Sequence, residues 1–220
     1  MNILIIVPHP DDEVLGFGGI IQKHTEKNDN VLVQFIIEIK NRKPKDQIGL
    51  ENQIDQSIIV GKKLGYNSKV YEVKLNDENF SQNVRYVSNI IEDFKPDILY
   101  SVFGGDNHQD HEYIFKIIRV ATRVWSNFLI KKIYLGEILS STDQSPKLPQ
   151  FAFIPTYYVP LTKKQVEMKI ECMKDYEEEV RNWPHPRSEK GIINKAESRG
   201  SECGYEYAEA FITLRNIDNL

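Results

Sequence analysis

Short runs of β-branched and leucine side chains alternate with longer amphipathic stretches along the first two thirds of the chain. Apolar runs of this kind, bounded by proline, glycine or polar clusters, are typical of buried strands. Stretches with apolar positions three and four residues apart favour helices. We therefore predict strands over residues 2–7, 31–38, 69–73, 97–103 and 132–138. Helices are predicted over residues 13–27, 50–64, 81–94 and 112–128.

This alternation predicts right-handed βαβ units and a mostly parallel sheet with helices on both faces. The expected architecture is an α/β, Rossmann-like three-layer sandwich with the common strand order 3-2-1-4-5. Ligands of such folds bind at the carboxyl ends of the strands, where the first and fourth strands are neighbours. A charged helical pattern follows over residues 160–181, and the prolines and glycines of 183–203 predict a loop. Nothing marks a domain boundary, so residues 1–220 are expected to form one domain.

Composition narrows the function classes. A net charge of −4 over 220 residues gives no general attraction for nucleic acid or anionic lipid. No apolar run approaches the ~18 residues of a membrane helix, and the N-terminus lacks a signal-peptide pattern. Cys172 and Cys203 are too few and too far apart for a disulfide framework. We expect a cytoplasmic protein with a small-molecule substrate, no nucleic-acid partner and no membrane insertion. The sequence is compatible with a homo-oligomer and does not decide the oligomeric state.

Acidic and histidine residues gather directly after two of the predicted strands. Residues 9–13 read HPDDE and residues 106–111 read DNHQDH, so three of the five histidines lie in these clusters. Burying so much acid in a small space is unfavourable unless a cation or a proton offsets the repulsion. His and Asp are ordinary zinc ligands. Since the expected sheet order makes the first and fourth strands neighbours, the clusters should meet in one metal-dependent active site.

Other features have simpler explanations. Acids in the first turn of a helix suit its dipole, but that accounts neither for His9 nor for the second cluster. The glycines between Gly16 and Gly19 lack the spacing of a dinucleotide-binding motif and follow the acidic turn. They predict instead a close approach of this helix to the sheet. His24 is expected to face solvent, and His185 to lie in the core or on the surface rather than in a pocket.

The two clusters resemble the metal motifs of the PIG-L/LmbE family of zinc-dependent N-deacetylases. The matching segments are PHPDDE over residues 8–13 and DxHQDH over 106–111, with weaker echoes at 137–142 and 204–211. The resemblance runs in order along nearly the whole chain. It implies hydrolysis of the acetamide of an N-acetylglucosamine-type group in a saccharide or glycoconjugate.

The resemblance also implies roles for single residues. By position, one Zn²⁺ ion per chain, which other divalent ions could replace, would be held by His9, Asp12 and His111. Three protein ligands leave an open position, as catalytic zinc requires.

Three further residues match catalytic positions of the family. Asp11 resembles the general base, and His108 the residue that stabilises the tetrahedral intermediate. Asp110 resembles the residue that orients His108. A carboxylate beside His108 is expected to keep that ring charged.

Two segments depart from the family pattern. Relatives often carry an Arg-x-x-Glu pair on the second helix, where this chain has Gln53 and Gln56. The second strand often ends in Thr-x-Gly, where residues 36–40 read IIEIK. Both segments border the substrate pocket in the family, so the resemblance predicts the catalytic chemistry better than the identity of the substrate.

The leading interpretation is a zinc-dependent N-deacetylase for an N-acetylated amino sugar or its conjugate. The alternatives are an amidase for another small amide, such as a thiol conjugate, and a catalytically idle sugar- or nucleotide-binding module. A binding module needs no general base, which argues against the second alternative. Metal-dependent phosphoester hydrolysis would need more bridging ligands than the sequence offers.

Overall fold

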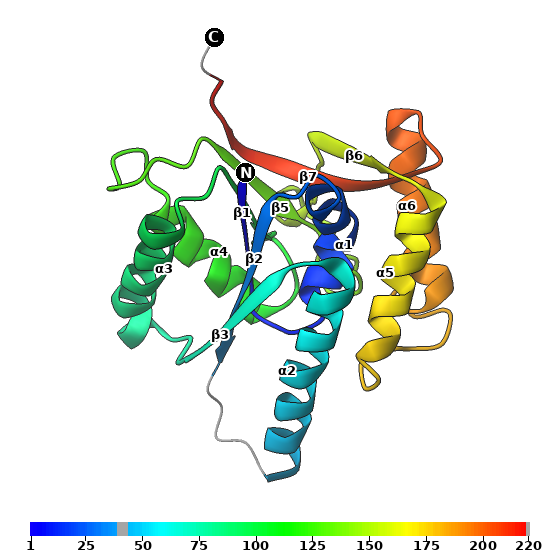
Figure 1. The fold of residues 1–220 in the computed structure, drawn as a ribbon, viewed down its shortest axis with the longest axis horizontal. Coiled ribbons are helices and arrows are strands. Elements are labelled where there is room, and N and C mark those ends of the chain that lie inside the picture. Colours follow the sequence, from blue (N-terminus) through cyan, green and yellow to red (C-terminus); the bar gives the residue numbers. More distant parts are fainter. Residues whose placement is uncertain (39–43, 219–220) are drawn as a thin grey trace.

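The computed structural model describes residues 1–38 and 44–218 (Figure 1). Its elements in chain order are β1 (Asn2–Val7), α1 (Asp12–Thr25), β2 (Asn30–Glu38), α2 (Pro44–Leu64), β3 (Asn67–Val73), α3 (Phe80–Phe94), β4 (Ile98–Val102), α4 (Gln109–Ala121), β5 (Lys132–Gly136), β6 (Tyr157–Leu161), α5 (Lys163–Asp175), α6 (Glu189–Cys203) and β7 (Tyr207–Asn216). The five predicted strands and the four helices between them are confirmed, although α4 ends earlier than predicted. Residues 39 and 40, which belong to the segment that departs from the family pattern after the second strand, lie outside the described residues.

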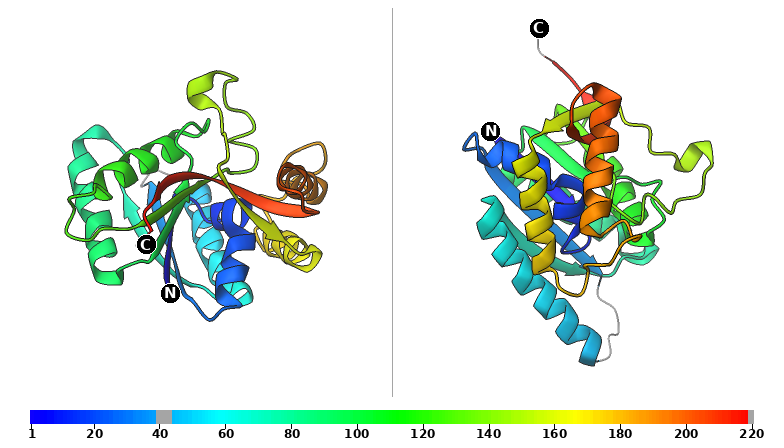
Figure 2. Two further views of the ribbon diagram at one scale, coloured as in Figure 1. Left: turned by 90° about the horizontal axis from the view of Figure 1, so that it is seen from above. Right: turned by 90° about the vertical axis from the view of Figure 1, so that its right-hand side faces the viewer.

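The sheet has seven strands in the order β3-β2-β1-β4-β5-β7-β6. The first five of these run parallel, and β7 is antiparallel to both of its neighbours. Helices α3 and α4 cover one face, and α1, α2 and α5 cover the other, with α6 beside α5 (Figures 1 and 2). The predicted three-layer α/β sandwich and its strand order are therefore confirmed.

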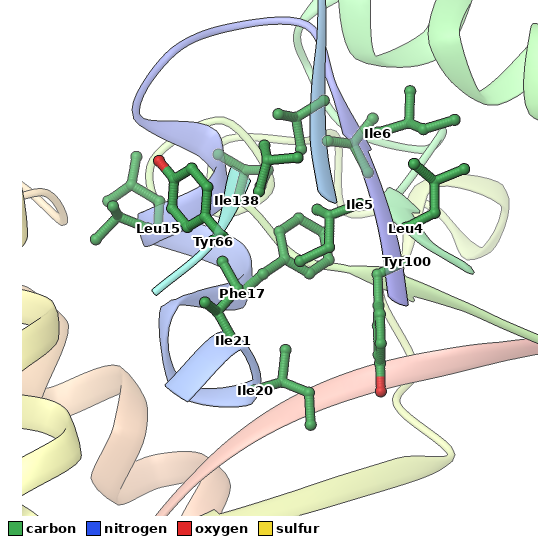
Figure 3. Packing of buried hydrophobic residues seen from close by; sticks show 14 of the residues in the cluster. Leu4, Ile5, Ile6, Leu15, Phe17, Ile20, Ile21, Tyr66, Tyr100 and Ile138 are labelled. Atoms are coloured by element: carbon green, nitrogen blue, oxygen red, sulfur yellow. The ribbon is translucent and has the colours of Figure 1, made fainter. Parts of the chain in front are cut away.

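Strand β1 lies inside this sheet, between β2 and β4, and is buried on both faces. The side chains from Ile3 to Val7 are fully buried, which explains why the strand is a continuous apolar run rather than an alternating one. Figure 3 shows Phe17 of α1 near Ile5 and Tyr100 of the sheet, with 6.3 Å between the centroids of Phe17 and Tyr100. Burying each large apolar side chain contributes about 1.5–3 kcal/mol. The loop that follows β1 therefore starts from a firmly held strand end.

The glycines of α1 allow it to lie close to the sheet layer, as predicted. A Cβ atom on Gly16 would lie 2.6 Å from Ile138 Cδ1, and one on Gly19 would lie 2.6 Å from Leu161 Cδ1. Larger residues at these positions would push the helix outwards and displace its first turn, which carries the acidic cluster.

The prediction that His24 faces solvent is wrong. Its side chain is buried, with Nδ1 2.7 Å from Asp29 Oδ2 and Nε2 3.2 Å from the Tyr100 hydroxyl. Because both ring nitrogens have partners, burial of this polar residue is tolerated.

The prediction of a loop over residues 183–203 is also wrong, because most of these residues form α6. The Ser188 hydroxyl caps the helix by accepting the N–H of Gly191 at 3.0 Å. Gly191 and Gly200 suggested a flexible segment, yet they serve close packing. A Cβ on Gly191 would lie 2.2 Å from the Pro186 carbonyl oxygen, and one on Gly200 would lie 2.6 Å from that of Glu206. The preceding helical pattern ends with α5, and only residues 176–188 form a loop.

Candidate active site

The two acidic clusters meet at the carboxyl end of the parallel strands, the lower edge of the sheet in Figure 1. Strands β1 and β4 are paired, with Ile6 opposite Ser101, so the loops that follow them lie side by side. The His9 ring centroid is 4.5 Å from that of His108 and 5.5 Å from that of His111. The structure thus brings together residues about a hundred positions apart, as the strand order predicted.

One carboxylate oxygen of Asp12 lies close to ring nitrogens of both His9 and His111. Asp12 Oδ2 lies 3.1 Å from His9 Nδ1 and 3.3 Å from His111 Nε2. Ligand atoms around a tetrahedral zinc ion are separated by about 3.4 Å, given metal–ligand distances of about 2.1 Å. The buried Nε2 of His111 makes no hydrogen bond despite its proximity to Asp12. The spacing of these atoms and the unpartnered His111 nitrogen make this a candidate metal site.

A second donor set overlaps with the first. The imidazoles of His9, His108 and His111 each offer a nitrogen within 4.8 Å of the others. The two sets share His9 and His111 and differ in the third ligand, Asp12 or His108. In either case the described residues form a potential metal site where the two motif loops meet.

The charges of this cluster hold protons on two imidazoles. Burial lowers the pKa of His9, but hydrogen bonds to Asp110 and Asp12 outweigh it and raise that pKa to about 9. Burial opposes the same change at His111, where Asp12 and Asp106 raise the pKa to about 10. The pKa of Asp12 falls despite its burial, because His111 and His9 surround it. Without a metal ion, protonated imidazoles thus balance the buried carboxylates that surround them.

Asp106 stands behind the candidate ligand His111. Its Oδ2 lies 3.1 Å from His111 Nδ1, and its Oδ1 accepts the backbone N–H of His108 at 2.8 Å. The Thr142 hydroxyl donates to Asp106 Oδ2 at 2.7 Å. Such carboxylates fix the ring orientation of a histidine ligand. Sequence reasoning assigned no role to Asp106, although its place at the head of the second motif was a usable signal.

Asp110 contacts two histidines in different ways. Its backbone N–H donates to His108 Nδ1 at 3.2 Å, because His108 caps the N-terminus of α4. Its carboxylate oxygen Oδ2 is 3.0 Å from His9 Nε2 but 3.9 Å from His108 Nδ1. Asp110 thus contacts His108 through its main chain, while its carboxylate faces His9.

The prediction of a charged His108 is wrong. Burial and the neighbouring imidazoles of His9 and His111 lower the pKa of His108 to about 4, and these effects outweigh the carboxylate of Asp110. The ring is therefore neutral at pH 7. Since Nδ1 accepts the N–H of Asp110, the neutral ring carries its hydrogen on Nε2.

Asp11 occupies a strained turn between β1 and α1. Its φ is 121°, a region costing roughly 1–3 kcal/mol for a residue other than glycine. The buried carboxylate of Glu13 holds this turn by accepting the Asp11 N–H at 2.9 Å, and the hydroxyls of Tyr66 and Tyr176 donate to Glu13. Burial and the charge of Asp12 raise the pKa of Asp11, while Arg187 opposes the rise. Strain of this kind is common at functional sites.

A pocket of about 230 Å³ opens beside Asp11 and the three histidines. Its far wall consists of Gln53 of α2 and two residues of the loop after α5, Glu179 and Arg187. Sequence reasoning missed Glu179 and Arg187, because no motif marks them. The Gln53 position, recognised only as a departure from the family pattern, does border the pocket.

Fold and site together define a doubly wound α/β protein with a candidate metal centre at the switch point of its sheet. The chain belongs to the PIG-L family, described as GlcNAc-PI de-N-acetylase, whose sequence model matches residues 4–122. This match confirms the resemblance seen in the two motifs. Among the residues that the structure describes, no helix is both long and apolar enough to cross a membrane.

Several solved structures share the fold over the whole chain. A deacetylase of teicoplanin biosynthesis is 17% identical with a TM-score of 0.76, and 100% of each chain is covered. The N,N'-diacetylchitobiose deacetylase from Pyrococcus horikoshii is 16% identical with a TM-score of 0.72, covering 96% of this chain and 83% of that one. The 4-carboxy-2-hydroxymuconate hydratase from Pseudomonas putida KT2440 is 13% identical with a TM-score of 0.72, and 100% of each chain is covered. At these identities the likeness establishes the fold and not the reaction.

Proposed function

We propose that this chain is a zinc-dependent N-deacetylase that releases acetate from an N-acetylated amino sugar or its conjugate. The proposal rests on one observation above all. Asp12 Oδ2 lies at tetrahedral spacing from ring nitrogens of His9 and His111, beside the carboxylate of Asp11 at the pocket. Because residues between positions 9 and 187 build the pocket, we treat residues 1–220 as one functional domain.

The ligands that we propose for the metal are His9, Asp12 and His111. Asp12 is preferred to His108 as the third ligand because it is almost fully buried between the other two, whereas His108 Nδ1 already accepts a main-chain hydrogen bond. When bound, zinc supplies Lewis acidity, which acidifies water and polarises a carbonyl oxygen.

Asp11 is the proposed general base. Its carboxylate lies next to the ligand Asp12 in sequence and lines the pocket, so it can accept the proton of the attacking water. Water then adds to the acetyl carbonyl carbon, and the C–N bond breaks. The proton held by Asp11 passes to the departing amine, which leaves acetate and a free amino sugar.

His108 is the proposed donor to the oxyanion that develops on the acetyl oxygen. As a neutral ring with hydrogen on Nε2, it offers one hydrogen bond to that oxygen without needing a charge. Preorganised donors of this kind contribute about 10²–10³-fold to the rate. The backbone N–H of Asp110 and the N-cap geometry keep the ring in this tautomer.

The proposal is tested by measuring acetate release from N-acetylated amino sugars, their glycoconjugates and an N-acylated thiol conjugate. Zinc-loaded protein should hydrolyse at least one of the sugars, chelation should abolish turnover, and Asp11→Asn should lower kcat by about 10²–10⁴-fold. Hydrolysis of the thiol conjugate alone would favour the amidase alternative. No acid release from any substrate would contradict the proposal and favour a binding module, or hydration chemistry such as the structural neighbour performs.

A further inference from the structure

Arg187 reaches the candidate active site from a loop far away in the sequence. The loop is fixed next to α6: the Arg187 N–H donates to His185 Nδ1 at 3.1 Å, and Ser188 caps the helix. The Arg187 side chain is only 20% exposed. Its guanidinium is therefore held in the pocket wall rather than free in solvent.

This guanidinium contacts three groups around the pocket. Nη1 donates to Asp11 Oδ2 at 2.8 Å and also to the carboxylate of Glu179. Nε donates to the Ser140 hydroxyl at 3.1 Å. Contacts through two nitrogens define the position and the plane of the group, which a single bond would not do.

From this arrangement we infer that Arg187 is the positioning residue for Asp11 and fixes the carboxylate that accepts the proton of the attacking water. The inference rests on the proposed function, because it assumes that Asp11 is the base. It explains how one carboxylate oxygen of Asp11 is tied down while the other stays available to the pocket.

Electrostatics gives a reason for a cation at this place. Asp11, Asp12 and Glu13 are consecutive and buried, and Glu179 adds a fourth carboxylate across the pocket. A metal ion at Asp12 would balance charge on one side of the cluster only. Arg187 supplies a permanent charge on the side of Asp11, since a guanidinium stays protonated at any relevant pH.

Glu179 and Gln53 extend this contact towards α2. The Gln53 amide donates to Glu179 Oε1 at 2.9 Å, and Glu179 in turn accepts from Arg187 through Oε2. Helix α2, the loop after α5 and the turn after β1 are thus linked through hydrogen bonds that end on Asp11. The glutamine that departs from the family pattern thus borders the pocket and also supports the arginine through Glu179.

The test is a double-mutant cycle in zinc-loaded protein with Arg187→Met and Asp11→Asn. Arg187→Met should lower kcat by about 10²-fold, as misplacement of a reacting group does, with KM and zinc content nearly unchanged. In the Asp11→Asn background the same substitution should have no further effect, because a positioning residue acts only through the group that it holds. Arg187→Lys should recover part of the loss, since lysine keeps the charge but not the fork.

The matched control is Arg181→Met, which removes a cation of the same loop that is 44% exposed and lies 3.9 Å from Glu179. Its kcat should equal that of the parent. A parental kcat in Arg187→Met, or an equal loss in both Asp11 backgrounds, would overturn the inference.

A second readout separates this inference from the proposed function. If the parent releases no acetate from any substrate, the proposed function fails. Thermal unfolding of the parent, the two single variants and the double variant then tests the contact between Arg187 and Asp11. Non-additive shifts in Tm support a direct Arg187–Asp11 interaction, whereas additive shifts refute it.

Discussion

The loops after β1 and β4 and the loop after α5 all border one pocket, but they are built differently. The first two start from buried, paired parallel strands, and these two loops, together with the first turns of α1 and α4 that follow them, carry every proposed metal ligand. The third is irregular, joins α5 to α6, and carries Glu179 and Arg187. In this account the strand ends supply the metal ligands and the general base, while the loop after α5 supplies the arginine that positions the base. The family match over residues 4–122 covers only the former.

The most severe change should be Asp12→Ala, which removes the carboxylate at the centre of the strand-end loops. We expect loss of stoichiometric zinc and of all turnover, because two histidines alone do not complete a zinc site. Elemental analysis of the purified variant checks this directly. Full zinc content would instead favour the set of three histidines, with His108 as the third ligand in place of Asp12.

Asp11→Asn should leave the metal in place and lower kcat by about 10²–10⁴-fold, the usual contribution of a general base. The amide has nearly the same size as the carboxylate but cannot accept the proton. Steady-state kinetics on the best substrate, with zinc content measured in parallel, tests this role. Activity within about threefold of the parent would remove Asp11 from the mechanism.

Thr142→Val asks whether the C-terminal part of the chain also supports the metal. The substitution deletes the 2.7 Å hydrogen bond to Asp106, which lies behind His111. Loss of such a supporting contact typically weakens metal affinity by about 10–100-fold. Competition with a chromophoric chelator measures the change. The control is Ser145→Ala, which deletes a nearby buried hydroxyl that donates to the Ser141 carbonyl at 3.3 Å. Equal zinc affinities in both variants would show that Thr142 does not support the metal site, which would then depend only on residues that follow β1 and β4.

The smallest expected signal is the release of protons when zinc binds. The pKa values of His9 and His111 are raised to about 9 and about 10, so both rings are protonated in metal-free protein at pH 7. Coordination requires neutral imidazoles, and about two protons per ion should therefore leave at pH 7, falling towards none above pH 10. Titration calorimetry in buffers of different ionisation enthalpy counts them. A binding heat independent of the buffer at pH 7 would contradict either the protonation of these rings in metal-free protein or their coordination of zinc.

The fold could be predicted from the sequence where local pattern and topology agree. The apolar run of β1 and the regular alternation up to β5 were sufficient for the strand order. Helix α6 was missed because Gly191 and Gly200 were interpreted as breakers, whereas both occupy places with no room for a side chain. Strands β6 and β7 were also missed; they come after the βαβ alternation has ended.

The site could be predicted in part for the same reason. Residues of the two motifs are marked by their spacing, and parallel strand ends bring them together. Arg187 lies 176 positions from its partner Asp11, and no local pattern announces that contact. The charge of His108 was misjudged because the sequence shows its neighbour Asp110 but not the rings of His9 and His111 packed against it.

Anomalous diffraction at the zinc edge, on crystals grown with zinc, tests most directly that the strand ends form a single-metal centre. We predict one peak per chain within bonding distance of His9 Nδ1, Asp12 Oδ2 and His111 Nε2, with His108 and Asp11 free of the metal. A peak bonded to His108 in place of Asp12, or two peaks bridged by the carboxylates, would contradict this account.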